Sequence, residues 1–168
     1  MKYILIGIAL TGMFFNLTAQ NNGSRLTDEQ RREALTRHNK YRADVGTNPL
    51  VWSNELATEA QAWADKLAKK GCAFEHSKTS HGENLYWASW KSTATEAINS
   101  WAEEIKYYHG QAISYSNYSK MGHYTQMVWY NTTEVGCAIG SCKNGSTIWV
   151  CTYNPAGNYI GEKPYGNE

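Results

Sequence analysis

The sequence predicts an α+β domain in which helices pack against an antiparallel sheet. Two observations carry this prediction. Helical patterns with capping signals fill the earlier part of the chain, and β-rich segments joined by a strong turn signal fill the last third. The 168 residues are 42% hydrophobic and 13% aromatic, which is enough to build one sizeable core. We therefore expect a single domain over residues 27–168.

The first helix is predicted from its two ends. It begins after Thr27, because residues 27–30 (Thr-Asp-Glu-Gln) have the form of a capping box. It extends to about Asp44, where a glycine and a proline within residues 45–49 end it. Residues 20–26 precede it as a short polar leader.

Two further helices are indicated by apolar residues at helical spacing. The second begins near Ser53 or Asn54 and is closed by Gly71, and the third begins near Thr93 or Thr95. The residues expected to face the core are Leu56, Ala60, Trp63, Leu67 and Ala68 in the second helix, and Ala94, Ile98, Trp101, Ala102 and Ile105 in the third.

Three β-rich segments follow, at residues 125–130, 134–140 and 147–153. Lys-Asn-Gly-Ser at residues 143–146 separates the last two, and an Asn-Gly pair between such segments is typical of a β-hairpin. Because these strands follow the helices rather than alternate with them, the sheet is expected to be antiparallel.

The N-terminus has the pattern of an export signal. Lys2 precedes an apolar run at residues 4–15, and Leu-Thr-Ala at residues 17–19 fits a cleavage site before Gln20. A retained anchor is the alternative, but the run is shorter than the ~20 residues that span a bilayer. We therefore expect cleavage after a signal at residues 1–19, no stable membrane anchor, and secretion to the extracellular space, or to the periplasm in a bacterium.

Charge excludes several classes of protein. The chain has 16 Lys+Arg against 15 Asp+Glu, and only 18% of its residues are charged. This charge composition differs from that of a disordered tail, a coiled coil or a histone-like protein. It also argues against nucleic acid as a partner, since binding to phosphates requires a basic surface.

Four cysteines, Cys72, Cys137, Cys142 and Cys151, become informative if the chain is exported. An even number in an oxidising compartment indicates two disulfides, with three possible pairings. Structural zinc bound by thiolates is the alternative, but the sequence has no Cys-x-x-Cys. A catalytic thiol is disfavoured because it would tend to oxidise.

Four ordered segments resemble the CAP superfamily of cysteine-rich secretory proteins, venom antigens and pathogenesis-related class 1 proteins, whose common unit is the SCP domain. They are His-Asn-Lys-Tyr-Arg at 38–42, Gly-Glu-Asn-Leu at 82–85, Gly-His-Tyr-Thr-Gln-Met-Val-Trp at 122–129 and Cys-Thr-Tyr-Asn-Pro-Ala-Gly-Asn-Tyr at 151–159. The resemblance covers about residues 27–165, and it is greatest to the plant pathogenesis-related class 1 type.

The resemblance implies a three-layer α-β-α sandwich with a central antiparallel sheet. It also implies the disulfides Cys72–Cys142 and Cys137–Cys151. Plant members usually have a third bridge in the loop before the Gly-His-Tyr motif, but residues 115–121 contain no cysteine. We therefore expect that loop to be more mobile.

The resemblance further places two histidines and two glutamates in one cavity. By motif they are His76, Glu83, Glu104 and His123. The quartet has three interpretations: a hydrogen-bonded polar network, a Zn²⁺ site with His76 and His123 as metal ligands, or a catalytic centre. No residue is assigned a catalytic role from the sequence.

The other histidines receive structural interpretations. His38 lies in the first-helix motif and is expected to support packing, whereas His81 and His109 match no motif and are expected at the surface. Four tyrosines form an aromatic segment that is a candidate lipid-contact loop, because some family members bind sterols or fatty acids. They are Tyr107, Tyr108, Tyr115 and Tyr118.

Three functions remain open. The first, which we favour, is a secreted, non-enzymatic binding module for a sterol, a fatty acid or a protein partner. The second is a divalent-metal-dependent hydrolase or peptidase, with Glu83 or Glu104 as general base. The third is a structural or defence module that acts through its surface or through a released C-terminal tail. An enzyme is disfavoured because the sequence shows no activated-nucleophile motif.

Overall fold

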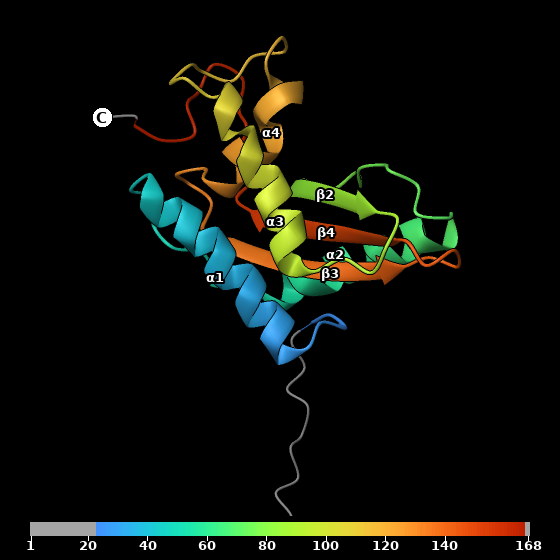
Figure 1. The fold of residues 1–168 in the computed structure, drawn as a ribbon. Helices are drawn as coiled ribbons and strands as arrows, with labels where there is room; N and C mark the ends of the chain where they lie inside the picture. The colour runs from blue at the N-terminus through green and yellow to red at the C-terminus, as the bar shows by residue number, and fades with distance from the viewer. Residues whose placement is uncertain (1–22, 167–168) are drawn as a thin grey trace, which may run out of the picture.

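A four-stranded sheet lies at the centre of the computed structural model, which describes residues 23–166 (Figure 1). Its strands are β1 (Val51–Trp52), β2 (Gly82–Ala88), β3 (Glu134–Ser141) and β4 (Thr147–Asn154). They lie in the order β1-β3-β4-β2. β4 pairs antiparallel with both β2 and β3, but β1 pairs parallel with β3. The expected antiparallel sheet is therefore correct except for this two-residue edge strand.

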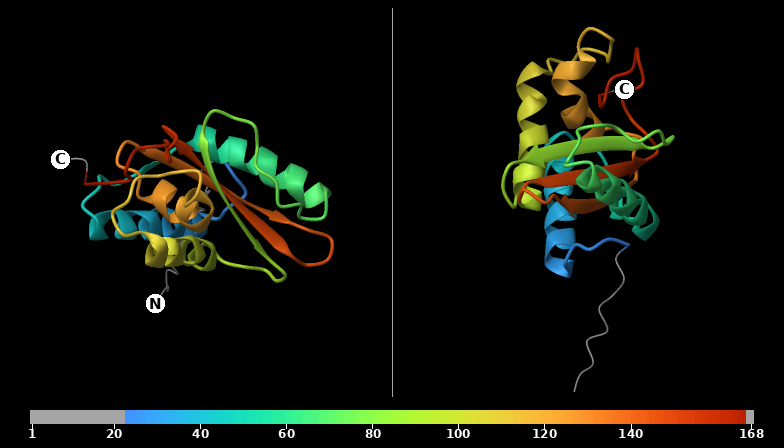
Figure 2. Two further views of the ribbon diagram at one scale, coloured as in Figure 1. Left: turned by 90° about the horizontal axis from the view of Figure 1, so that it is seen from above. Right: turned by 90° about the vertical axis from the view of Figure 1, so that its right-hand side faces the viewer.

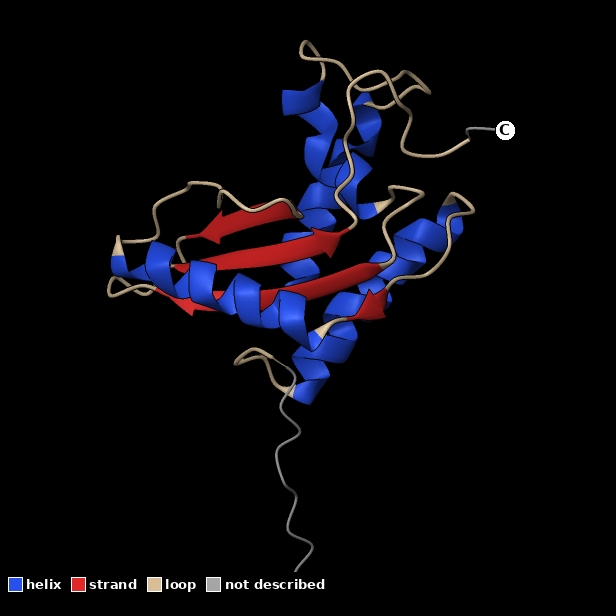
Figure 3. Cartoon of the chain, turned by 180° about the vertical axis from the view of Figure 1, so that it is seen from behind, coloured by secondary structure: helices blue, strands red, loops and turns tan. Residues whose placement is uncertain are grey.

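Helices cover both faces of the sheet. They are α1 (Asp28–Asp44), α2 (Asn54–Lys69), α3 (Ala94–Ala102), the 3-10 helix η1 (Glu103–Tyr107) and α4 (Tyr118–Met127). Figure 2 shows α2 on one side of the strands and α1, α3 and α4 on the other. Viewed from behind, α2 crosses in front of the sheet (Figure 3). The three-layer α-β-α sandwich is confirmed.

The predicted helix starts are confirmed by local hydrogen bonds. Thr27 accepts a bond from the Gln30 amide at 3.2 Å, and the Gln30 side chain accepts one from the Thr27 amide at 2.9 Å. Ser53 caps α2 through its hydroxyl. Thr93 and Glu96 form a second capping box at the start of α3. Each bond satisfies a backbone N–H that the first helical turn would otherwise leave unpaired.

The strand predicted at residues 125–130 is wrong, because this segment contains the end of α4 and the turn after it. Thr125 has high strand propensity, but its hydroxyl donates to the Met121 carbonyl one turn earlier at 3.0 Å. Met121 and Met127 are fully buried, so packing overrides local propensity. The loop expected at residues 115–121 is likewise partly helical.

Two apolar clusters fill the space between the layers. One lies between the sheet and α1, α3 and α4, and includes Trp101, Trp129 and Trp149. The other lies beneath α2 and includes Leu67 and Leu85. The core position predicted for Ile105 is wrong: it is 48% exposed, because the chain changes from α3 to the tighter η1 before reaching it.

Both predicted disulfides are present. Cys137 and Cys151 lie directly opposite each other on β3 and β4, with 4.1 Å between their Cα atoms. Cys72 and Cys142 connect the end of α2 to the β3–β4 hairpin, with 5.9 Å between their Cα atoms. The second bridge also fixes the start of the loop that leads from α2 into the candidate site.

Most of the residues that the N-terminal predictions concern lie outside the part of the chain that the structure describes. The export signal at residues 1–19 and the first part of the polar leader lie outside the described residues, so both stay predictions. Within residues 23–166, no helix combines the length and the apolar character needed to cross a membrane.

Candidate functional site

The loop after α2 and the start of β2 form the first histidine–carboxylate pair. His76 donates from Nδ1 to Oε1 of Glu83 at 2.7 Å, and the same oxygen accepts the Ser77 amide at 2.9 Å. The Glu83 side chain is 7% exposed, whereas that of His76 is 54% exposed. The buried carboxylate therefore holds the orientation of a more exposed imidazole.

The second pair joins α4 to η1. His123 donates from Nδ1 to Oε1 of Glu104 at 2.7 Å. The other Glu104 oxygen accepts the amides of His123 and Tyr124 at 2.9 and 3.1 Å. Trp101 stacks on the imidazole, with 6.3 Å between ring centroids and 17° between ring planes. The choice of Glu104 rather than its neighbour Glu103 is supported by these contacts.

The two pairs meet at a small cavity of about 160 Å³. His76, Glu83 and His123 line it, whereas Glu104 lies behind His123 and faces a neighbouring groove. Each imidazole uses Nδ1 for its carboxylate, which leaves Nε2 as the remaining ring nitrogen. Among residues 23–166, no group of three or more His, Cys, Asp or Glu is placed to hold a metal ion. Within this part of the chain, the cavity offers an ion the two Nε2 atoms of His76 and His123.

A buried network lies behind His123. Asn84 donates from Nδ2 to the His123 carbonyl at 3.0 Å and to the Tyr153 hydroxyl at 3.2 Å. His38 donates from Nδ1 to the Ala34 carbonyl and meets the Tyr153 hydroxyl through Nε2, each at 2.8 Å. Burial lowers the pKa of His38 to about 4, so its imidazole is neutral and Nε2 accepts. The packing role predicted for His38 is consistent with these contacts.

Sequence reasoning did not find Asn84 or Tyr153 as members of this network. The signal for Asn84 was its place in the Gly-Glu-Asn motif: once this segment is known to be a strand, Asn84 must point to the opposite face from its neighbour Glu83. Nothing local identified Tyr153, which lies 115 residues from His38. Burial raises the pKa of the Tyr153 hydroxyl well above its usual range, so it remains a neutral donor.

Arg42 anchors the other side of the helical layer. Its side chain is fully buried and donates to four main-chain carbonyls, those of Asn48, Met127, Trp129 and Thr132. Burial lowers the pKa of Arg42 to about 10, which leaves the guanidinium charged at neutral pH. These bonds fix the end of α4, and thereby the helix that carries His123.

A larger cavity of about 490 Å³ adjoins the small one, and His76, Glu83 and Tyr118 line both. Its lining combines polar side chains, among them those of His76 and Glu83, with the exposed side chains of Tyr115, Tyr118 and Ile160. The residues that line it are His76, Ser77, His81, Gly82, Glu83, Tyr115, Tyr118, Gln126, Ala156, Gly157, Asn158 and Ile160.

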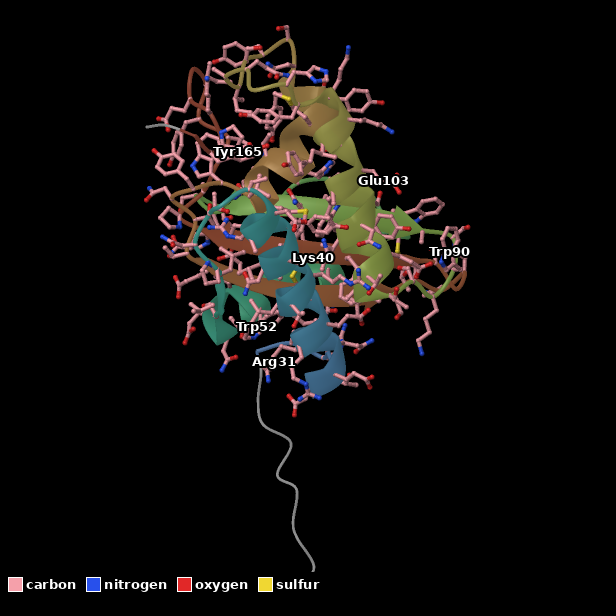
Figure 4. The ribbon with its side chains drawn as sticks, turned by 60° about the vertical axis from the view of Figure 1, so that its left-hand side comes forward. Arg31, Lys40, Trp52, Trp90, Glu103 and Tyr165 are labelled. Atoms are coloured by element: carbon pink, nitrogen blue, oxygen red, sulfur yellow. A yellow bond between two sulfur atoms is a disulfide. The ribbon has the colours of Figure 1, made fainter. Side chains whose placement is uncertain are left out.

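The four tyrosines of the predicted lipid-contact loop do not act together. Tyr115 and Tyr118 line the larger cavity and are 90% and 46% exposed. Tyr107 is exposed but does not line this cavity. The prediction is wrong for Tyr108, which is buried against Tyr165 with 5.1 Å between ring centroids. Figure 4 labels Tyr165. The ring of Tyr108 is occupied by the packing of the C-terminal segment.

His81 is partly exposed, with 30% of its side chain accessible, and it also lines the larger cavity. Its Nδ1 donates to Glu59 of α2 at 3.0 Å. The sequence contained no motif that linked these two residues. His109 is exposed, as predicted.

An α-β-α sandwich with two disulfides and two histidine–glutamate pairs defines a class of domain, and comparison with known proteins identifies it. Residues 35–153 match the model of the cysteine-rich secretory protein family, CAP, and the chain belongs to that family. It is similar to pathogenesis-related protein 1C of Nicotiana tabacum, with 44% identity over 78% of each chain. Pathogenesis-related protein 1 of Arabidopsis thaliana is 35% identical over 98% of this chain and 96% of its own.

Among solved structures, the chain is similar to NaASP2 crystallised with Zn²⁺. The TM-score is 0.72 and the identity 28%, over 83% of this chain and 86% of that one. The family resemblance inferred from the four sequence segments is confirmed.

Proposed function

We propose that the protein is an exported, non-enzymatic binding module whose partner docks on the tyrosine-rimmed cavity of about 490 Å³. The observation that carries the proposal is the exposure of Tyr115 and Tyr118 at its mouth, at 90% and 46%. Exposed aromatic side chains around a concave site are typical anchors of protein interfaces. A defence-related role is consistent with the pathogenesis-related proteins that the chain resembles.

The lining favours a protein partner over a sterol or a fatty acid. His76, His81 and Glu83 contribute polar groups to the lining. Rings or an alkyl chain buried there would cover the Nε2 atoms of His76 and His81 without offering them a hydrogen bond, which is costly. A polar side chain of a protein can satisfy them while its backbone rests on the tyrosine rim. Sterol and fatty-acid binding are the alternatives that the experiment must separate.

Local contacts near His76 favour binding over nucleophilic catalysis. The Ser77 hydroxyl contacts the Thr79 hydroxyl at 3.5 Å. An activated serine would instead need an imidazole within hydrogen-bond reach of its hydroxyl.

The proposal is tested by cross-linking capture from the exported proteins of the source cells. Wild type and Tyr115→Ala serve as bait, with Tyr107→Ala as the matched control because it removes an exposed tyrosine outside the cavity. We expect one captured protein that wild type and the control share and that Tyr115→Ala loses. Its affinity is then measured with the purified partner.

The same three proteins are titrated with cholesterol and with palmitate. Saturable lipid binding that Tyr115→Ala abolishes would show that the cavity binds a lipid, and it would refute the protein-partner proposal. Equal capture by all three baits would show that the cavity is not the docking site.

A second candidate function rests on the two imidazoles at the small cavity. We propose that His76 and His123 hold a divalent ion such as Zn²⁺, with solvent completing its coordination. The support is that each Nδ1 is fixed by a carboxylate, the arrangement that orients metal-binding histidines in proteins. The similar NaASP2 structure contains Zn²⁺. A bound ion would supply a Lewis acid, and the protein would then be a metal-dependent hydrolase.

Calorimetric titration with ZnCl₂ tests this candidate. We expect binding by wild type, loss in His76→Ala and in His123→Ala, and no change in His109→Ala, which removes an exposed histidine away from the cavity. Identical heats from all four proteins would exclude metal binding by this pair.

A further inference from the structure

A groove of about 420 Å³ runs along the free edge of β2, which is the outermost strand of the sheet at this side. It is distinct from the tyrosine-rimmed cavity and shares no lining residue with it. The residues that line the groove are Cys72, Phe74, Leu85, Tyr86, Trp87, Ser100, Trp101, Glu104 and His123.

The groove wraps around the strand edge and draws on both layers. Leu85 belongs to the apolar cluster beneath α2, whereas Tyr86 packs against the cluster on the opposite face. Trp87 follows Leu85 by two residues and therefore points to the same side as Leu85. One wall is thus formed by the loop after α2, and the other by α3 and η1.

Two large aromatic side chains in the groove are exposed to solvent. Phe74 is 58% exposed and Trp87 is 46% exposed, although both line a concave site. Exposed apolar rings gathered in a groove are typical of a binding site rather than of a surface without a binding function. Ser100, Tyr86 and Glu104 contribute polar groups to the same lining.

This edge is closed to strand addition at its centre. An incoming peptide strand would need the outward main-chain groups of β2. The Leu85 carbonyl already accepts a bond from the indole N–H of Trp101 at 2.9 Å. The ligand must therefore bind through the side chains of the groove and not through the strand backbone.

The charged side chains of the groove limit the classes of ligand that can bind there. None of the described residues that line the groove is a lysine or an arginine, and Glu104 contributes a carboxylate. A phosphorylated, sulfated or otherwise acidic ligand would have no counter-charge there. The lining thus argues against an acidic ligand, and it suits a neutral one with apolar faces to stack on aromatic rings and hydroxyl groups to bond to polar side chains.

From this combination we propose that the β2-edge groove binds a neutral oligosaccharide. The C–H faces of the sugar rings stack on Trp87 and Phe74, and ring hydroxyls bond to Ser100, Tyr86 and Glu104. A volume of about 420 Å³ suits a short chain of sugars rather than a single one. The site does not depend on the tyrosine-rimmed cavity, so either proposal can fail without the other.

The test is calorimetric titration of the full-length exported protein with chitohexaose, cellohexaose and laminarihexaose. We expect saturable binding of at least one of them. Replacing a stacking aromatic ring should weaken it by about tenfold, both in Trp87→Ala and in Phe74→Ala. Both side chains are about half exposed, so both variants are expected to fold, which a thermal melt checks.

Trp90→Ala is the matched control. Trp90 is 53% exposed, lies three residues from Trp87, and does not line the groove. Figure 4 shows it at the margin of the molecule. It should keep wild-type affinity, as should Tyr115→Ala in the other cavity.

Two outcomes would overturn the proposal. One is the absence of binding to all three sugars at millimolar concentration. The other is binding that survives both Trp87→Ala and Phe74→Ala, which would place the sugar elsewhere on the surface.

Discussion

Acidification should destabilise the fold through His38, well before most carboxylates titrate. Burial lowers the pKa of this imidazole from 6.5 to about 4 in the folded protein. Between these two values the unfolded chain binds a proton that the folded chain does not. The stabilisation is therefore complete above about pH 6.5 and is lost progressively as the pH falls toward 4.

The magnitude follows from the same two values. The difference between 6.5 and about 4, at about 1.4 kcal/mol for each pKa unit, amounts to about 3 kcal/mol. Such a loss is a large part of the free energy of unfolding of an ordinary domain, which is about 5–15 kcal/mol. The structural cause is the closed environment of His38, whose partners are the Ala34 carbonyl and the Tyr153 hydroxyl.

The assay is urea unfolding followed by tryptophan fluorescence at a series of pH values from about 8 to 4. His38→Gln is the comparison, because an amide can still donate and accept but does not titrate. Carboxylates contribute equally to both proteins, so the difference between the two stability curves isolates His38. Curves that stay parallel across this range would refute the assignment of a buried, neutral imidazole.

Two further predictions concern packing and covalent links. Gly136→Ala should lower the free energy of unfolding by about 1–3 kcal/mol in urea, because the added Cβ would lie 2.1 Å from the Ala57 amide nitrogen of α2. Ser141→Ala at the exposed end of the same strand should be nearly neutral, and equal effects would contradict the close approach of α2. Replacing Cys72 and Cys142 together by alanine should cost about 4 kcal/mol, because the bridge closes a 70-residue separation. A melting temperature unchanged from wild type would show that the unfolded chain is not constrained by this link.

Much of the fold could be predicted because its signals are local. The start of α1 was predicted at Thr27, that of α2 near Ser53 or Asn54, and that of α3 near Thr93 or Thr95. The structure caps these helices with Thr27, Ser53 and Thr93, whose side chains bond to amides three residues away. The β3–β4 hairpin followed from its turn residues. β2 was missed, although its Gly-Glu-Asn motif was recognised, because an edge strand with partly exposed residues has no clear alternation.

At the candidate site, local sequence signals identified residues but not their arrangement in space. The family motifs supplied His76, Glu83, Glu104 and His123, but not how they pair. The structure joins His76 to Glu83 and His123 to Glu104, and it brings only three of the four to the small cavity. It also adds His81, for which the sequence had no motif.

The amino-acid sequence by itself determined the helix caps, the hairpin, the cysteine count and the family, since each depends on neighbours a few residues apart or on short ordered motifs. Tertiary structure alone decided that His38 is shielded from protons, that Tyr108 is buried while Tyr115 is exposed, and that Phe74 and Trp87 border one groove. The physical reason is that burial and solvent exposure depend on which distant segments pack together. No short stretch of chain contains that information.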